Sequence, residues 1–236
     1  MDAAARPVAL EDGDAEAFDR ILSARHSCRA FRPDPVPRAT IEAILTTAQK
    51  TASWNNTQPW QVTIASGAAR DRFRAAMVER AASGAAHASD LPFPSEYRGV
   101  YLERRRACGF QLYGAVGIER GDKEAYRRQT LRNFELFDAP HIAMVTTDAA
   151  IGVYGAVDCG AYVSNFMAAA QSRGVATIAQ AALAVHSDLV RELLGIPEGR
   201  LVVCGISFGY ADTSAPVNSY RTPRASLDEV VTFIDS

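Results

Sequence analysis

Residues 53–62 read SWNNTQPWQV, and this stretch decides how the middle of the chain is interpreted. Two tryptophans enclose three side-chain amides, and the pattern then changes to that of a short strand around residues 61–65. An amide donates and accepts hydrogen bonds at once, which suits a heterocycle whose edge alternates donors and acceptors. Trp60 is best interpreted as a core residue. For Asn55 and Gln58, contact with a heterocycle and a plain polar turn both remain open.

Apolar residues at helical spacing surround this loop on both sides. They predict helices over residues 15–25, around 41–48, around 73–77, over 101–113, 123–134 and 155–173, and from a cap at Ser187 to a stop at Gly195. Strands are expected over residues 61–65, 141–147 and 201–208. Helices outnumber strands, and the two do not alternate strictly, so we expect an α+β fold. The helix over 155–173 is apolar or small on nearly every side, which predicts a central, mostly buried helix, and Gly174 is its expected stop.

The bulk properties exclude several classes of protein. The chain has 236 residues and a formal charge of −2, which argues against non-specific nucleic-acid binding. Its four cysteines form no close pair, so we expect a reduced, cytoplasmic protein. No signal peptide and no membrane span is expected, and neither a Rossmann motif nor a P-loop is present. Without metal-ligand spacing or an acid–base motif, the chemistry is best left to a cofactor.

Two basic clusters stand at opposite ends of the chain. RHSCR, residues 25–29, precedes a proline-rich turn, and Arg221 and Arg224 lie in the tail. Guanidinium groups bind phosphates and carboxylates with fork-shaped sets of donors. Each cluster alone is equally explained as a solvated surface, and spacing does not show that the two meet. The many arginines between residues 98 and 132 alternate with acidic residues and are interpreted as solvated helix faces.

A resemblance rests on these same stretches taken in order. RHSCRAFRPDPVP, followed by SWNNTQPW, resembles the opening signature of the FMN-dependent nitroreductase family. FELFDAPH at 134–141, GVATIAQ at 174–180, and LGIP, GISFGY and the tail also fit. The similarity runs from about residue 18 to the end. The region from EYRGVYLERRR to LYGAVGI is most similar to the branch that includes nitrobenzoate reductases.

The resemblance implies an α+β nitroreductase fold with a mostly antiparallel sheet, a homodimer, and two FMN sites at its interface. It places one set of residues on the FMN phosphate and ribityl chain: Arg25, His26, Ser27, Arg29, Arg224 and, less directly, Arg221. A second set would come from the partner subunit and line the flavin: Ser53, Trp54, Asn55 and Gln58. Ala179, Gln180 and Ala181 would run past the flavin edge, with a backbone N–H aimed at N5. Here many family members have Pro and Glu-Gly, so the side-chain roles in this loop stay open.

The resemblance also implies the reaction. NADPH or NADH would reduce the flavin, and a nitroaromatic or quinone-like compound would then be reduced in a ping-pong cycle, with no catalytic side chain and no metal. Reductive dehalogenation or flavin fragmentation on the same fold, a non-catalytic flavin-binding protein, and a structural dimer without cofactor remain alternatives. We expect one domain over residues 1–236, with a flexible segment at 1–14, a substrate-pocket insert at 85–135 and a tail at 211–236 that wraps the partner. Candidate pocket walls are Tyr97, Phe110, Tyr113 and Phe134, although each is equally explained as core.

Overall fold

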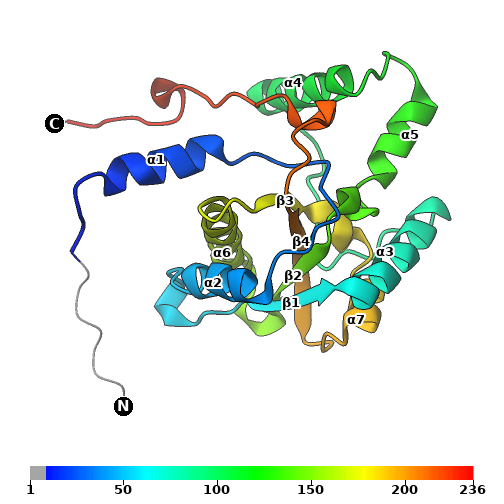
Figure 1. The fold of residues 1–236 in the computed structure, drawn as a ribbon, viewed down its shortest axis with the longest axis horizontal. Helices are drawn as coiled ribbons and strands as arrows, with labels where there is room; N and C mark the ends of the chain where they lie inside the picture. Colours follow the sequence, from blue (N-terminus) through cyan, green and yellow to red (C-terminus); the bar gives the residue numbers. More distant parts are fainter. Residues whose placement is uncertain (1–8, 236) are drawn as a thin grey trace.

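The computed structural model describes residues 9–235 and has the expected α+β fold (Figure 1). Its helices are α1 (Asp14–Ala24), α2 (Arg38–Ala48), α3 (Gly67–Ala82), α4 (Gly99–Ala115), α5 (Lys123–Leu131), α6 (Val153–Gln171) and α7 (Ser187–Leu194). Its strands are β1 (Gln61–Ser66), β2 (His141–Asp148), β3 (Ala176–Gln180) and β4 (Arg200–Gly209). Every helix expected from periodicity is present, within a few residues of the expected ends.

The strands form one sheet in the order β1-β2-β4-β3, and all three pairings are antiparallel. The expected mostly antiparallel sheet is therefore confirmed. β3 was not expected as a strand. It has only five residues and lacks an alternating apolar pattern, and its pairing with β4 places Gln180 opposite Gly205. Its strand conformation thus depends on a partner distant in the sequence.

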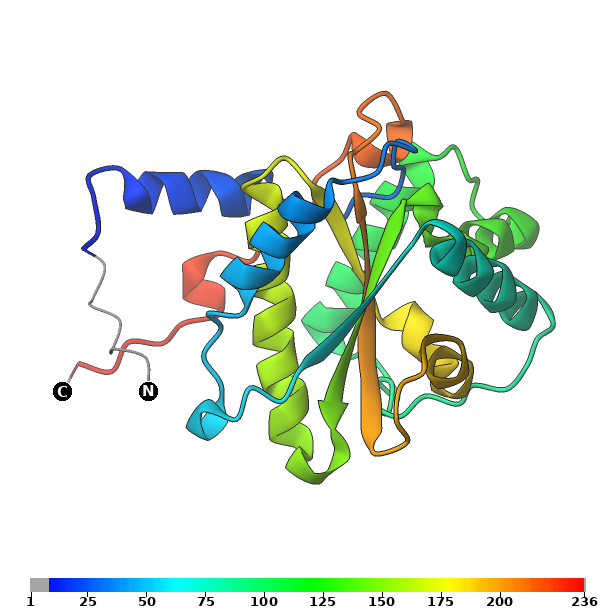
Figure 2. The same cartoon turned by 60° about the horizontal axis from the view of Figure 1, so that its bottom comes forward.

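Helices cover both faces of the sheet, which explains why seven of the eight residues of β2 are buried. Successive side chains of a strand point to opposite faces. Ala143 and Val145 accordingly pack with α2 and α6, whereas Ile142 and Met144 pack with α3 and α7. Figure 2 shows the two layers on either side of the sheet.

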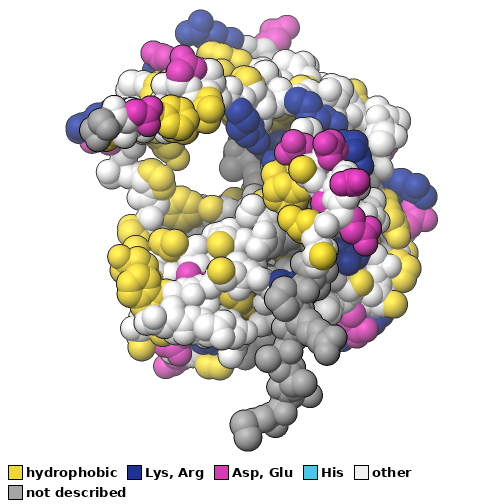
Figure 3. Space-filling model, turned by 90° about the vertical axis from the view of Figure 1, so that its left-hand side faces the viewer, with side chains coloured by type: hydrophobic (Ala, Val, Ile, Leu, Met, Phe, Trp, Pro, Cys, Tyr) yellow, Lys and Arg dark blue, Asp and Glu magenta, His cyan; other side chains and the backbone are white. Residues whose placement is uncertain are grey.

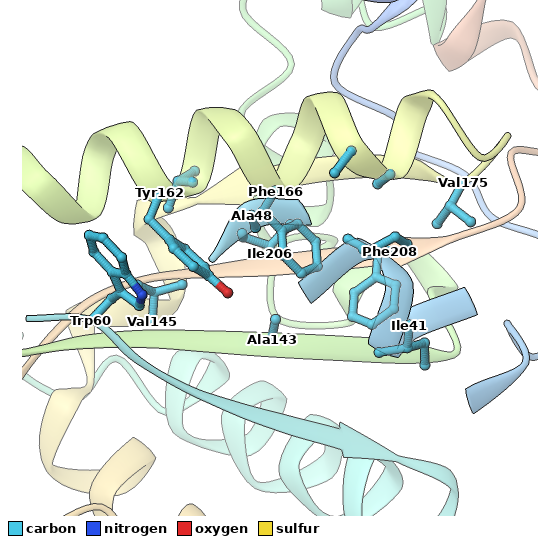
Figure 4. Close-up of a cluster of buried hydrophobic side chains, with 14 of the residues drawn as sticks. Ile41, Ala48, Trp60, Ala143, Val145, Tyr162, Phe166, Val175, Ile206 and Phe208 are labelled. Atoms are coloured by element: carbon cyan, nitrogen blue, oxygen red, sulfur yellow. The ribbon is translucent and has the colours of Figure 1, made fainter. Parts of the chain in front are cut away.

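The core between α6 and the sheet is built on aromatic rings (Figure 4). Trp60 stacks on Tyr162 with ring centroids 5.0 Å apart, and it is buried as expected. Phe166 meets Phe208 edge to face at 5.7 Å. The expectation that α6 is buried on most sides holds for this face only, because large apolar side chains near its N-terminus remain exposed.

Two helices end at the glycines expected to stop them, but the last helix does not begin at its expected cap. Gly174 and Gly195 have φ of 70° and 63°, the left-handed conformation in which glycine commonly ends a helix. The expected cap at Ser187 is wrong. Its hydroxyl donates to the carbonyl of Ala184 at 2.8 Å, and the preceding residue, His186, occupies the cap position.

The N-terminal segment is only partly covered by the structure. Of the expected flexible segment 1–14, residues 1–8 lie outside the described residues, and α1 begins at Asp14. Between residues 9 and 235, no helix is long and apolar enough to span a membrane.

His141 makes stability depend on pH. Its Nε2 accepts a hydrogen bond from the Val36 N–H at 2.9 Å, and its Nδ1 lies 2.6 Å from the Ser66 hydroxyl. Burial, and then the charge of Arg70, lower the pKa of His141 below its ordinary value of 6.5. The unfolded chain therefore takes up this proton at a higher pH than the folded one. Stability is full above pH 6.5 and falls as the pH drops below it.

We expect the free energy of unfolding of wild-type protein to fall between pH 7.5 and 5.5. The fall should be smaller in His141→Gln, because glutamine cannot take up the proton that destabilises the folded protein. His87→Gln is the matched control, since His87 is exposed. Urea unfolding at both pH values checks this. An equal pH dependence in His141→Gln and wild type would contradict the role of His141.

Candidate functional site

The two basic clusters meet in one pocket of about 420 Å³. The segment that follows α1 contributes Arg25 and Arg29, and the C-terminal segment contributes Arg221 and Arg224. His26 and Ser27 also line the pocket, and none of the aspartates and glutamates in the described part of the chain does. The pocket is lined by Leu22, Ser23, Arg25, His26, Ser27, Arg29, Cys108, Tyr220, Arg221, Thr222 and Arg224. The sequence left open whether the two clusters are separate solvated surfaces or meet in space. The structure shows that they meet.

Backbone pairing holds the first half of the pocket in place. Ser27 forms an isolated parallel bridge with Thr177 of β3, and the Cys28 N–H donates to the Thr177 carbonyl at 3.0 Å. The segment 25–29 therefore extends the sheet beyond β3. Because this pairing fixes the backbone, the side chains of the segment project from a rigid edge.

Asn218 joins the second half of the pocket to the first. This side chain is buried, and its Oδ1 accepts a hydrogen bond from the Arg29 N–H at 2.8 Å. Its Nδ2 donates to the carbonyls of Ala30 at 2.9 Å and Asp212 at 2.8 Å. The sequence analysis missed Asn218, since a lone asparagine gives no signal until its partners are known.

Within residues 9–235, no guanidinium group of the pocket forms an ion pair with a carboxylate. Arg29 donates to the Tyr220 hydroxyl at 3.1 Å, and Arg221 donates to the Asn218 carbonyl at 2.9 Å. Burial, and then the charge of Arg224, lower the pKa of Arg25. Like charges brought together without a carboxylate repel one another. An anion bound among them would relieve that repulsion.

His26 adds an unpaired buried donor or acceptor to this pocket. Its Nδ1 lies 3.2 Å from the Ala24 carbonyl, whereas its Nε2 is buried and has no partner among residues 9–235. Burial is the main cause that lowers its pKa, with the nearby arginines acting in the same direction. Because Nδ1 donates to a carbonyl, the neutral ring leaves Nε2 as an acceptor, and a buried acceptor without a partner is costly.

The loop at residues 53–58 does not line this pocket within one chain. It is held against α6, where the Trp54 N–H donates to both carboxylate oxygens of Asp158 at 3.2 and 3.1 Å. Asp158 is only 8% exposed. The Gln58 N–H donates to Ser53 Oγ at 2.9 Å, and Asn55 and Gln58 both have φ of 47°. A loop held in such a conformation presents its exposed amides in a fixed arrangement.

The side chain of Gln180 is held by two other parts of the protein. Ser207 Oγ donates to its Oε1 at 2.5 Å, and its Nε2 donates to the Asn133 carbonyl at 2.8 Å. Gln180 is buried, whereas Ala179 and Ala181 on either side are exposed. Ala179, Gln180 and Ala181 were all expected along the flavin edge. Because the side chain of Gln180 is already bonded within the protein, only its backbone is free for such a contact.

The four candidate wall residues do not form one wall. Phe110 is 65% exposed, Tyr113 packs on Tyr126 at 4.6 Å, and Tyr97 lies beneath the Arg105 guanidinium at 5.0 Å. Only Phe134 lines a large cavity, of about 790 Å³, between α3, α4, α5 and the turn at Ala181–Val185. The remaining three residues are placed by local contacts that the sequence pattern did not reveal.

Comparison with known proteins assigns the chain to a family. The nitroreductase family model matches residues 22–210. Nitroreductase NfnB of Mycolicibacterium smegmatis is 40% identical over 229 residues, which are 93% of each chain. A 4-nitrobenzoate reductase of Nocardioides sp. is 34% identical, covering 93% of this chain and 90% of its own.

A solved structure has the same fold. The crystal structure of the FMN-dependent nitroreductase NfnB of Mycobacterium smegmatis in complex with NADPH has a TM-score of 0.90 and 39% identity. The match covers 94% of this chain and 99% of that one. Sequence and architecture agree, and the chain belongs to the nitroreductase family.

Proposed function

We propose that this protein is an FMN-dependent oxidoreductase that uses NADPH or NADH to reduce nitroaromatic compounds. One observation carries the proposal: four guanidinium groups meet in a pocket that no carboxylate among residues 9–235 lines. A phosphate monoester fits such a donor set, because it is a dianion with several acceptor oxygens. A relative of known structure, NfnB of Mycobacterium smegmatis, is named as FMN-dependent and is bound to NADPH.

The chain's own residues would bind and orient the cofactor. Arg25, His26, Ser27 and Arg29 would hold its phosphate and ribityl chain, with Arg221 and Arg224 closing the pocket from the tail. The exposed backbone at residues 179–181 would lie along the flavin edge. When bound, FMN supplies the hydride transfer between the nicotinamide donor and the nitro compound. Positive charge and backbone N–H groups would stabilise the negative charge that accumulates beside them.

The same proposal includes a homodimer in which each site uses both copies. Ser53, Trp54, Asn55 and Gln58 are exposed or half-buried on one chain, outside its own arginine pocket, so a second copy would bring them to it. Val153 and Val157 of α6, and Phe233 and Ile234 of the tail, are large apolar residues with most of their surface exposed. Figure 3 shows apolar side chains around an open gap on the side from which both ends of the chain project. A partner that fills this gap, and around which residues 211–236 wrap, would bury them.

A visible spectrum of the purified protein tests the function. We expect flavin absorbance, its loss when NADPH is added without oxygen, and its return when nitrobenzene is added. Protein that lacks this absorbance and does not acquire it from added FMN would contradict the proposal. If NADPH bleaches the flavin but no nitroarene restores its absorbance, the protein binds a flavin and is not a nitroreductase.

A further inference from the structure

The large cavity carries chemistry that the FMN site does not use. It is lined by Ala81, Gly84, Ala85, His87, Phe93, Arg105, Arg127, Thr130, Leu131, Phe134, Ala182, Val185 and His186. About half of its lining residues are apolar, two guanidinium groups, two imidazoles and the Thr130 hydroxyl supply the polar part, and no aspartate or glutamate among residues 9–235 lines it. Such a lining fits a flat apolar molecule that carries a negative charge.

Its arginines are available for a ligand. Within residues 9–235, no carboxylate forms an ion pair with Arg105 or Arg127, although Arg104 and Arg128, next to them in sequence, pair with Glu229 and Glu124. Arg105 is supported from one side by the ring of Tyr97. Both guanidinium groups thus retain their donors for an anion in the cavity.

His186 adds a buried imidazole to the wall of the cavity. The residue is only 2% exposed, it lines the cavity, and its buried Nδ1 has no partner among the described residues. Its ring lies beside Phe134, with centroids 6.0 Å apart. Because Nδ1 itself has almost no accessible surface, the two arginines are the polar groups that a ligand in the cavity would meet.

The position of the cavity connects it to the reaction. Ala182 lines it and directly follows Ala179–Ala181, the segment expected along the flavin edge. A molecule in the cavity therefore lies next to that segment. Resting on the proposed function, we infer that Arg105 and Arg127 select nitroaromatic acceptors that carry a carboxylate, with the aromatic body against Phe93 and Phe134.

The test replaces both arginines and separates binding from turnover. The variant is Arg105→Gln/Arg127→Gln, and the matched control is Arg106→Gln/Arg128→Gln, which changes neighbours on the same helices that do not line the cavity. Benzoate is the first probe, because it has the carboxylate and the ring but no nitro group to reduce. By calorimetry, we expect its dissociation constant to rise about tenfold or more in the variant and to stay unchanged in the control. Neutral benzamide should be insensitive to both changes.

The second readout is the ratio of kcat/KM for 4-nitrobenzoate to that for nitrobenzene. We expect the variant to lower it about tenfold and the control to leave it unchanged. A variant that retains both the wild-type benzoate affinity and this ratio overturns the inference, while nitrobenzene turnover would still support the proposed function. If the variant instead lowers only the preference for NADPH over NADH, the cavity binds the donor's phosphate, and the assignment to the acceptor is wrong. Arginine-dependent benzoate binding without any nitroarene turnover would uphold the site and overturn the proposed function.

Discussion

Arg25→Ala is expected to weaken FMN binding roughly ten- to a hundredfold. A hydrogen bond between a guanidinium and a phosphate contributes roughly 1.5–3 kcal/mol, and Arg25 lines the pocket between Arg29 and Arg224. Fluorescence titration of the cofactor-free protein with FMN measures the loss. Arg20→Ala is the matched control, since Arg20 is an exposed arginine of α1, five residues before Arg25, and does not line the pocket.

The stability of cofactor-free Arg25→Ala separates a binding role from a structural one. Burial and the charge of Arg224 already lower the pKa of Arg25, so the guanidinium is unfavourably placed without an anion. We therefore expect cofactor-free variant to unfold at the wild-type temperature or slightly above it. Loss of FMN affinity together with a lower unfolding temperature would contradict a direct phosphate contact.

A mixed dimer extends the same experiment to the proposed exchange between subunits. Asn55→Ala should also weaken FMN binding if Asn55 reaches the partner's site. In a heterodimer of Arg25→Ala and Asn55→Ala subunits, one site would carry both changes and the other neither. Recovery of one tightly bound FMN per heterodimer is expected, and its absence would contradict a site shared between two copies.

Arg200→Met is expected to cost about 3 kcal/mol or more in the free energy of unfolding. Arg200 is only 9% exposed. Its Nε donates to Thr146 Oγ1 at 2.8 Å, and its Nη2 donates to the carbonyls of Thr146 at 2.9 Å and Pro59 at 2.7 Å. The pairing of β2 with β4 shifts register between Val145 and Thr146, and Arg200 satisfies the carbonyl there. Methionine removes the guanidinium donor from the Pro59 carbonyl and leaves the Thr146 carbonyl only the distant Cys159 thiol, at roughly 1–3 kcal/mol for each buried acceptor.

Thermal unfolding checks this second prediction. For a chain of this length, about 3 kcal/mol corresponds to a drop in Tm of roughly 6–12 °C. Arg72→Met, at an exposed position of α3, should change Tm little. Since Pro59 ends the amide-rich loop, Arg200→Met should also weaken FMN binding. A Tm within about 2 °C of wild type would show that water or a neighbouring donor replaces the guanidinium.

The parts of the fold with local causes could be predicted from the sequence. Helix periodicity placed α2 and α6, and glycine at the left-handed position marked the ends of α6 and α7. β3 was missed, because its five residues become a strand only through pairing with β4. The cap at Ser187 was wrong for a local reason, since its hydroxyl donates to the carbonyl of Ala184, three residues earlier.

In the candidate site, too, residues identified by type could be predicted, whereas contacts between distant parts of the sequence could not. Residue type alone pointed to Arg25, Arg29, Arg221 and Arg224, and the structure brings all four together. The buried side chain of Gln180 could not be predicted, because its partners Ser207 and Asn133 lie far away in the sequence. The arginines that line the large cavity were interpreted as solvated, since helix charge patterns do not reveal which ones lack an acidic neighbour.

The hydrogen bond from Arg29 to Asn218 spans 189 residues and makes the pocket a late product of synthesis. The first half of the anion site leaves the ribosome well before the second half, which follows 189 residues later. A nascent chain that has not reached Asn218, or one cut by proteolysis before it, would have only one side of the cradle. Because contacts so remote in sequence form slowly, docking of the C-terminal segment would be among the final events of maturation. A nucleotide that bridges the two ends would then hold the finished chain closed.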